Sequence, residues 1–245
     1  MNDLMTKSLA QIVNEDHRAA TVFEKYHLDF CCKGKRSLQQ ACAESQVAAD
    51  ELIAALETMV KPDNYSVHLN YNLLSLSQLA DYIVATHHAY VKQEMPQILS
   101  YLQRVASKHG DRHPEMRKVA EIFAAVKEEM EQHMQKEELI LFPRIKEVEK
   151  EGAELNRKKL TVSYLEAPVD MMEEEHDHAG AAMAEIRELT DNYNPPADAC
   201  TTYKLSYAAL EAFEKDLHQH VHLENNILFP KAIGLFSKSA IAGFN

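Results

Sequence analysis

The sequence has no tryptophan and only 6 glycines among its 245 residues. It is rich in alanine, leucine, glutamate, lysine and methionine instead, a composition that favours helices over sheets. No stretch approaches the roughly 18 to 20 apolar residues that cross a bilayer, and the N-terminus lacks the apolar centre of a signal peptide. We therefore expect an all-α, soluble and cytoplasmic protein that does not bind membranes.

Basic residues are outnumbered by acidic ones. The chain has 26 Lys and Arg residues against 38 Asp and Glu residues, which gives a formal net charge of −12. Such a charge repels phosphate backbones and anionic membrane surfaces. Nucleic acids are therefore not expected as partners.

Cysteine is rare as well, with Cys31, Cys32, Cys42 and Cys200 only. This is not the usage of a secreted domain held together by disulfides. A bond between Cys31 and Cys32 would be strained, because Cα atoms of neighbouring residues are about 3.8 Å apart and disulfides favour about 4.4 to 6.8 Å. We expect free thiols in a reducing compartment.

A segment near residues 61–75 lacks helical periodicity and separates two helix-rich parts of the chain. In the first part, the pattern predicts a short helix capped by Ser8 and helices over residues 19–26 and 48–60, with the cysteine pair between helices. The predicted organisation is a small helical N-terminal domain over 1–62, a linker over 63–76, a helical bundle over 77–236 and a C-terminal tail over 237–245.

Four long amphipathic stretches make up the second part. Pro114 and Pro168 stand where a proline in the first turn of a helix is tolerated. Short connections between such helices predict an up-down-up-down four-helix bundle. The helices are expected over residues 77–108, 114–149, 168–192 and 199–233.

The most informative feature is a duplicated string, which runs from His133 to Pro143 and again from His220 to Pro230. In each copy a glutamate follows the histidine by four residues, so that both side chains project from one face of a helix. Another histidine precedes the two copies by 45 and 44 residues, at His88 and His176. Two helix-loop-helix units packed with pseudo-twofold symmetry would bring these side chains to one buried point. The predicted metal ligands are His88, His133, Glu137, His176, His220 and Glu224.

This ligand set suits iron, because carboxylates are hard donors that can bridge two metals and imidazole is accepted by iron, zinc and copper. If Glu137 and Glu224 both bridge, two non-haem iron ions with a shared oxo or hydroxo group reach about five ligands each. One position on each iron then stays open for NO or O2. A lone buried histidine is more often structural, but six aligned residues in a repeat reverse that expectation, since their burial without metal would leave charges unpaired.

Several residues near the predicted ligands need a separate interpretation. His87, His178 and His222 are offset by one or two positions, so they are expected at the surface or behind the ligands. Glu129 and Glu175 are candidates to support the ligands or to line a route for protons or ions, with a solvated acidic face as the alternative for Glu175. Core packing is assigned to Leu139, Leu141, Phe142, Ile227 and Phe229.

The thiols of Cys31 and Cys32 are candidates for redox chemistry, nitrosylation or transient metal contact. Three basic residues stand within residues 33–36, and positive charge lowers a thiol pKa. The alternative is a pair of small buried residues without chemistry. Cys42 and Cys200 do not belong to a recognisable motif, so structural roles are assigned to them.

Taken together, these strings resemble those of a known family. The segment FEKYHLDFCCKGK at residues 23–35, followed by the two His-x3-Glu strings, is similar to the RIC proteins, the di-iron proteins for repair of iron centres. Shorter strings at residues 175–180 and 195–202 agree, so the resemblance covers nearly the whole chain. It implies a hemerythrin-like bundle with iron ligands at the six positions given above. His88 rather than His87 takes the first position because it stands eight residues before Pro96.

The resemblance also implies a stress-response protein that repairs iron-sulfur clusters damaged by nitric oxide or oxidants by supplying iron, with NO binding at the di-iron centre. Damaged iron-sulfur proteins would be its partners, NO or O2 its small ligands, and a homodimer is compatible with the sequence. Two alternatives stay open: an NO reductase that forms N2O, and hemerythrin-type O2 binding or sensing. Hemerythrins have a second histidine where this chain has Gly180, and the family usually has Cys-Cys-Gly-Gly where this chain has Lys33.

Overall fold

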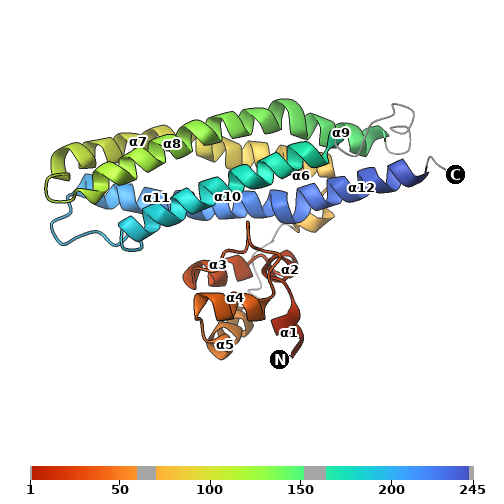
Figure 1. Cartoon of the computed structure of the whole chain (residues 1–245), viewed down its shortest axis with the longest axis horizontal. Coiled ribbons are helices and arrows are strands. Elements are labelled where there is room, and N and C mark those ends of the chain that lie inside the picture. Colours follow the sequence, from red (N-terminus) through yellow and green to blue (C-terminus); the bar gives the residue numbers. More distant parts are fainter. Residues whose placement is uncertain (1, 60–69, 152–163, 243–245) are drawn as a thin grey trace.

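The computed structural model describes residues 2–59, 70–151 and 164–242. Within these ranges the regular structure is helical, apart from one isolated bridge between Ser8 and Ser37. A long bundle of helices lies beside a small module of short helices (Figure 1). Nowhere in the described ranges does a helix have the length and apolar character needed to cross a membrane. The predicted fold class, an all-α bundle preceded by a small helical domain, is confirmed.

Three of the four bundle helices contain a π-helical turn. The first helix consists of α6 (Leu76–Ile83), η2 (Val84–His88) and α7 (Ala89–His109). The second consists of α8 (Glu115–Lys136), η3 (Glu137–Leu141) and α9 (Phe142–Glu151). The third is α10 (Glu166–Leu189), and the fourth consists of α11 (Thr201–Leu223), η6 (Glu224–Leu228) and α12 (Phe229–Ala242).

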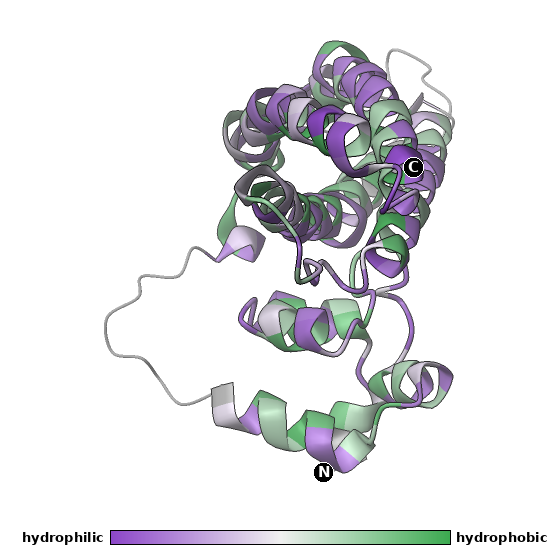
Figure 2. Cartoon of the chain, turned by 90° about the vertical axis from the view of Figure 1, so that its left-hand side faces the viewer, coloured by the Kyte–Doolittle hydropathy of each residue, from purple (hydrophilic) through white to green (hydrophobic). Residues whose placement is uncertain are grey.

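The four helices pack in the predicted up-down-up-down order. α8 packs against α7 and α10, and α11 packs against α7 and α10. Figure 2 looks along the bundle and shows the helices around a common axis, with the short N-terminal helices on one side. Each helix therefore presents one face to the interior, where the predicted ligands were placed.

Two of the expected helix ends differ from the structure. The third helix stops at Leu189 rather than near residue 192, because Asp191, Asn192 and Tyr193 have φ angles of 49°, 57° and 59°, in the left-handed region that ends a right-handed helix. The fourth helix continues to Ala242, past the expected end at residue 233. Half of the expected linker, residues 63–69, and residues 152–163 of the break expected after the second helix lie outside the described residues.

Polar residues divide the apolar interior of the bundle. One core cluster includes Met95, Phe123, Met130 and Phe213, and a second lies farther along the bundle. The second includes Leu79, Ile83, Phe142, Ile145 and Phe229. On the first and third helices His88 and His176 fall between the residues of the two clusters, and on the second and fourth helices the ligands lie where one cluster gives way to the other. The candidate site is thus a polar layer with apolar packing on both sides.

The N-terminal module has its own core and five short helices. Ser8 caps the second helix as predicted, by accepting a hydrogen bond from the Gln11 amide. The same Ser-x-x-Gln pattern recurs at Ser37 and caps a helix that the sequence analysis missed. The helices are α1 (Asn2–Thr6), α2 (Leu9–Glu15), α3 (Ala19–Lys25), α4 (Leu38–Ser45) and α5 (Ala49–Met59).

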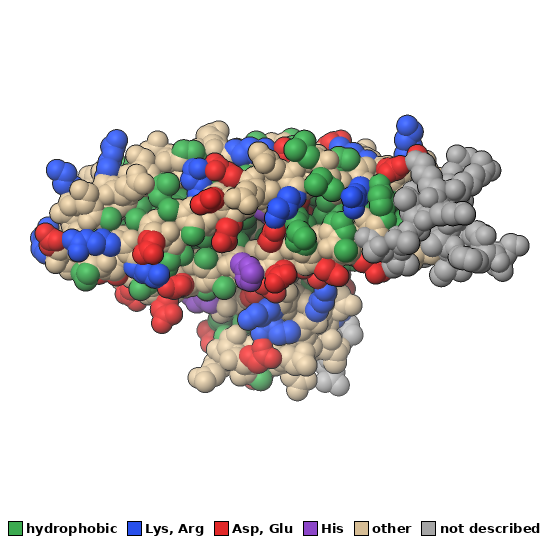
Figure 3. All heavy atoms as spheres, turned by 45° about the horizontal axis from the view of Figure 1, so that its top comes forward, with side chains coloured by type: hydrophobic (Ala, Val, Ile, Leu, Met, Phe, Trp, Pro, Cys, Tyr) green, Lys and Arg blue, Asp and Glu red, His purple; other side chains and the backbone are tan. Residues whose placement is uncertain are grey.

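Specific hydrogen bonds dock the module on the bundle. Because Pro230 has no N–H, the carbonyl of Asn226 lacks its usual partner four residues later in the helix. That carbonyl accepts a hydrogen bond from Asn14 Nδ2 of α2 at 3.3 Å, and the Asn226 side chain donates to the Cys31 carbonyl at 3.0 Å. Acidic side chains also gather along the bundle edge beside the module (Figure 3), and Glu173 pairs there with Lys35.

Candidate metal centre

The structure brings all six predicted ligands together in the interior. None of them is more than 2% exposed. They form two clusters that share both glutamates, and within each cluster the potential ligand atoms lie within 4.8 Å of one another. The first cluster is His88, Glu137, His220 and Glu224, and the second is His133, Glu137, His176 and Glu224.

Each cluster takes one histidine from each half of the repeat. His88 lies with His220, and His133 lies with His176, so both pairs join helices that are neighbours in the bundle. The Nε2 atoms of His88 and His133 lie 3.2 and 3.3 Å from Glu137 Oε2. Those of His176 and His220 lie 3.1 Å from the two oxygens of Glu224. Each carboxylate therefore stands between two imidazoles of different clusters.

The two carboxylates lack the hydrogen bonds that buried oxygens normally have. Although imidazole Nε2 atoms lie 3.1 to 3.3 Å from Oε2 of Glu137 and Oε2 of Glu224, these two oxygens and Oε1 of Glu137 are buried and meet no donor in hydrogen-bond geometry among the described residues. Buried polar atoms without partners are rare, and buried charges without compensation cost several kcal/mol. Cations between the carboxylates would supply the missing interaction, so these residues fit a pair of metal ions.

Hydrogen bonds at the outer ring nitrogens prepare three imidazoles to bind a cation. Nδ1 of His88 lies 2.7 Å from Glu138 Oε1, and Nδ1 of His133 lies 2.9 Å from Glu175 Oε2. Nδ1 of His176 lies 2.9 Å from Asn225 Oδ1. Since each partner atom is an oxygen acceptor, each Nδ1 donates its proton outward, so a cation at the centre could take the Nε2 lone pair in place of a second proton.

π-helical turns stand at three of the ligand positions. η2 ends at His88, η3 begins at Glu137 and η6 begins at Glu224. A π turn inserts an extra residue into a helical turn and is frequent at functional sites. Leu139 is 75% exposed, so its assignment to the core was wrong. A residue two positions after the buried Glu137 points to the opposite side of the helix.

The electrostatics of the site favour positive charge between the carboxylates. Burial would lower the pKa of His133, but Glu137 and Glu175 raise it to about 10. Burial would likewise raise the pKa of Glu224, but His220 and His176 hold it well below its usual range. The hydrogen bond from His133, together with Lys136, lowers the pKa of Glu175 to about 2. The centre therefore holds ionised carboxylates that attract cations.

Comparisons with known proteins identify the two parts of the chain. Residues 79–232 match the Hemerythrin HHE cation binding domain, and residues 5–60 match the ScdA_N model, described as a Domain of Unknown function (DUF542). The chain is 33% identical to the iron-sulfur cluster repair protein YtfE of Enterobacter sp. (strain 638), over 92% of this chain and 96% of the relative. It is 35% identical to the YtfE proteins of Musicola paradisiaca and Edwardsiella ictaluri, over 93% of this chain and 96% and 97% of theirs.

The chain belongs to the YtfE family. This confirms the resemblance that was drawn from the cysteine-pair segment and the repeated His-x3-Glu strings. Because the matches cover both the N-terminal module and the bundle, the family assignment applies to the chain as a whole.

The three histidines of this YtfE-family chain that were expected at the surface or behind the ligands do not all lie in the same kind of place. His178 is exposed, whereas His87 and His222 are buried. His87 stacks on His220 with ring centroids 5.7 Å apart and lies 3.0 Å from Asp216, while His222 contacts Asn14 of the module at 3.1 Å. Neither His87 nor His222 belongs to the two clusters.

The acidic candidates mark an opening to the centre. Glu129 and Glu175 line a cavity of about 220 Å³ between α8 and α10 that reaches His133. Glu138 and Asn225, which hold two of the imidazoles, were not among the predicted site residues. Each of these two residues directly follows a predicted glutamate ligand. A polar side chain at that position was the signal in the sequence that could have identified them.

The cysteine pair of the YtfE-family chain lies where the module meets the bundle. Cys31 is buried in the bundle core and Cys32 is half-buried, and both are free thiols. The expected lowering of the thiol pKa was wrong for Cys31. Its hydrogen bond with Cys32, burial and the charge of Asp29 raise the pKa well above the usual value. The nearby basic residues pair elsewhere, Lys35 with Glu173 and Arg36 with Glu44.

The other two cysteines have different surroundings. Cys42 is buried in the core of the module, where a structural role was assigned. Cys200, at the start of α11, is exposed, and its Sγ lies 3.3 Å from Nε2 of His109 at the end of α7. Cys200 is therefore not a core residue.

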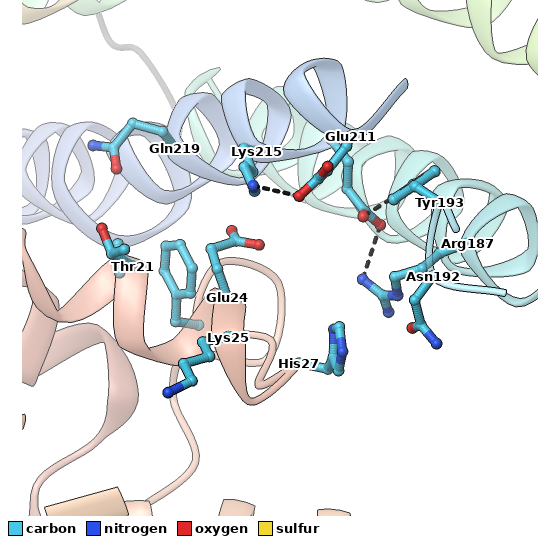
Figure 4. A pocket seen from close by; sticks show the side chains of 13 residues that line it. Thr21, Glu24, Lys25, His27, Arg187, Asn192, Tyr193, Glu211, Lys215 and Gln219 are labelled. Atoms are coloured by element: carbon cyan, nitrogen blue, oxygen red, sulfur yellow. Dashed lines mark hydrogen bonds and ion pairs between the residues drawn. The ribbon is translucent and has the colours of Figure 1, made fainter. Parts of the chain in front are cut away.

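Two cavities lie at the junction of module and bundle. The thiols line one of about 480 Å³, and the other, of about 510 Å³, is drawn in Figure 4. There, side chains of α3 face Glu211 and Lys215 of α11, while Arg187 reaches Glu214. Since Glu24, His27, Arg187 and Glu214 line both cavities, the two are neighbours along this junction.

Proposed function

We propose that the chain holds two iron ions in the bundle and supplies iron for the repair of iron-sulfur clusters damaged by nitric oxide or oxidants. The observation that carries this proposal is the pair of buried clusters that share Glu137 and Glu224. The relatives' printed name, iron-sulfur cluster repair protein, supports the repair role.

The donor set supports iron over a structural zinc ion. Each cluster offers two imidazole nitrogens and two carboxylates, with no thiolate, whereas structural zinc sites favour cysteine. When bound, such irons could take up a small molecule such as NO and could also be released to a client. Glu137 and Glu224 would lie between the two ions, and the two histidine pairs would hold one ion each.

The surrounding residues divide the work of holding and releasing the ions. Glu138, Glu175 and Asn225 fix the imidazole rings by accepting the Nδ1 protons. Glu129 and Glu175 place carboxylates along the opening between α8 and α10, where they would attract an ion that enters or leaves. Apolar cores on both sides of the layer keep water away from the centre.

The first test is metal analysis of anaerobically purified protein. We expect about two iron ions per chain, and loss of both in His133→Ala or His220→Ala, because each change removes a donor next to a shared carboxylate. His178→Ala, which removes an exposed histidine of α10, is the matched control and should keep its iron. Equal iron in the wild type and in His133→Ala would overturn the proposed site.

A second measurement distinguishes iron supply for cluster repair from catalytic reduction of NO. Protein loaded with isotopically labelled iron is mixed with a cluster protein that has been damaged by NO, and label in the repaired cluster is measured. Transfer of label supports iron supply. Catalytic N2O formation with an electron donor, without transfer of label, would instead make the chain an NO reductase. A stable oxygen adduct without either result would make it an oxygen-binding protein.

A further inference from the structure

A second group of metal-ligand side chains lies outside the bundle centre. The carboxylate of Asp29 and the thiols of Cys31 and Cys32 offer three ligand atoms within 4.8 Å of one another. They stand in the loop between α3 and α4, where the module meets the bundle. None of these residues contacts the two histidine and glutamate clusters by a hydrogen bond or ion pair within the described structure.

The spacing of the sulfur atoms fits an ion between them. Cys31 Sγ and Cys32 Sγ are 3.9 Å apart, and Cys31 Sγ is 3.3 Å from Asp29 Oδ1. Two thiolates on one tetrahedral ion, with metal-sulfur bonds of about 2.3 Å, stand about 3.8 Å apart. A disulfide would need about 2.05 Å. The thiols therefore have the separation of two ligands of one ion.

Hydrogen bonds within the chain fix the backbone of the loop in this arrangement. Asp29 Oδ1 accepts hydrogen bonds from the N–H groups of Cys31, Cys32 and Lys33, at 3.1, 3.0 and 3.2 Å. On the other side, Asn226 Nδ2 donates to the Cys31 carbonyl. No described residue donates to Asp29 Oδ2, so this oxygen stays available as a ligand. A site that is held in place beforehand loses little entropy on binding.

Access and space are also present. Cys32 and Asp29 line the cavity of about 480 Å³, so an ion can reach the half-buried thiol from solvent. The bundle wall of that cavity includes the small residues Gly180, Ala181 and Ala184 beside the larger polar residues Asp177, Arg187, Glu214 and His218. A Cβ atom at Gly180 would lie 3.6 Å from Cys32 Sγ, and a larger side chain there would fill the space next to the thiol.

The simpler interpretation is that Asp29 caps a turn and the cysteines only fill space. Capping explains the three bonds to Oδ1, and packing explains the burial of Cys31. The adjacency of the cysteines and the hydrogen bond between them explain the closeness of the two sulfurs, but neither capping nor packing requires the second thiol to line a solvent cavity beside Asp29. A ligand role accounts for the carboxylate and both thiols together.

We propose that Asp29, Cys31 and Cys32 form a second metal site, which takes a thiophilic divalent ion, namely ferrous iron on its way to a client. The transit role rests on the proposed iron supply, whereas the site itself does not. Binding replaces the two S–H protons by the ion and releases both protons to solvent, with no change of oxidation state. Because iron-sulfur clusters are held by cysteine thiolates, the ion would pass to a client by exchange between ligands of one kind.

The test uses Co²⁺ as the probe, because its thiolate complexes absorb strongly. Iron-loaded full-length protein is titrated with Co²⁺ without oxygen, and both absorption and proton release are recorded. We expect one ion per chain, a thiolate-to-cobalt band, and two protons released per ion. Cys32→Ser and Asp29→Asn should weaken binding at least tenfold, whereas Cys200→Ser, which changes an exposed thiol, should leave it unchanged. Absence of the band, or an unchanged band in Cys32→Ser, would overturn the site.

Further arms separate this site from the bundle centre. His133→Ala should lose bundle iron and keep the cobalt band, while Cys32→Ser should keep bundle iron. Cys32→Ser is nearly isosteric, and its helical content and unfolding midpoint report whether the fold is intact. Transfer of labelled iron should slow at least fivefold in Cys32→Ser. A cobalt band with unchanged transfer would overturn the transit role.

Discussion

At the scale of single residues, the four histidines of the centre are not held in the same way. His88, His133 and His176 each have an oxygen acceptor at Nδ1, but Nδ1 of His220 is buried and has no hydrogen-bond partner in the described structure. His220 is held by stacking against His87 instead. The two proposed ions therefore have differently supported ligands, and single changes outside the ligand set should affect them unequally.

Glu138→Ala should weaken the ion held by His88 and His220. Glu138 Oε1 accepts from His88 Nδ1 and also pairs with Lys92 at 2.6 Å. Its loss frees the imidazole to rotate and leaves the lysine charge nearby. Loss of such a supporting carboxylate lowers metal affinity about 10- to 100-fold. Competition with a chelator measures this, with Glu121→Ala, an exposed glutamate of α8, as control. Equal affinities in both variants would contradict the role given to Glu138.

At the scale of elements, the local pattern was enough to predict the helices and the ligand faces. A spacing of four residues predicts a shared face, and His133 with Glu137 bears this out geometrically. The π turns η2, η3 and η6 could not be predicted in the same way, because a π turn depends on packing around the centre and not on the spacing of residues along the chain. The pairing of His88 with His220 also needed the structure, since it joins the first and last helices of the bundle.

The start of the first bundle helix depends on a contact from the second. Glu149 of α9 accepts hydrogen bonds from the N–H groups of Leu76 and Ser77, at 2.6 and 2.9 Å. Ser75 caps α6 from its own side by accepting from the Gln78 amide. A carboxylate at a helix N-terminus satisfies free N–H groups and interacts favourably with the helix dipole. This contact joins α6 and α9 at the end of the bundle.

Glu149→Gln should destabilise the bundle in a pH-dependent way. Burial would raise the pKa of Glu149, but hydrogen bonds from Ser77 and Leu76 hold it below the ordinary value of 4.5. Since the folded pKa is depressed, the stabilisation is complete above pH 4.5 and is lost as the pH falls through the folded value. We expect a loss of about 0.5 to 2 kcal/mol at pH 7 that shrinks in acid.

Urea unfolding of the wild type and Glu149→Gln across this pH range gives the difference directly. Glu128→Gln, which changes an exposed glutamate of α8, serves as control and should be close to neutral at every pH. A constant difference between wild type and Glu149→Gln from pH 7 down to acid would show that the carboxylate charge does not contribute.

At the scale of the whole molecule, one segment of the fourth helix joins the centre to the module. Glu224 belongs to both clusters, Asn225 fixes His176, and Asn226 binds the cysteine loop. The sequence shows these three residues as neighbours, but it does not show that they face three different partners. Consecutive residues of a helix point to different sides, and Pro230 leaves a carbonyl free for Asn14. Contacts between residues more than 200 positions apart are beyond any local pattern.

Asn14→Ala should loosen the module without changing the centre. Asn14 lies on α2, and its side chain donates to the Asn226 carbonyl and contacts His222 Nε2 at 3.1 Å. The change would leave the buried His222 nitrogen without that partner, at a cost of about 1 to 3 kcal/mol. We expect faster hydrogen exchange over residues 28–33, where the cysteine loop meets the bundle, while iron content stays the same. Gln39→Ala, which removes an exposed amide of α4 in the same module, should change neither. If exchange in the loop were the same in both variants, the contact of Asn14 would have no part in docking; if Asn14→Ala also lost iron, the module and the centre would be one cooperative unit.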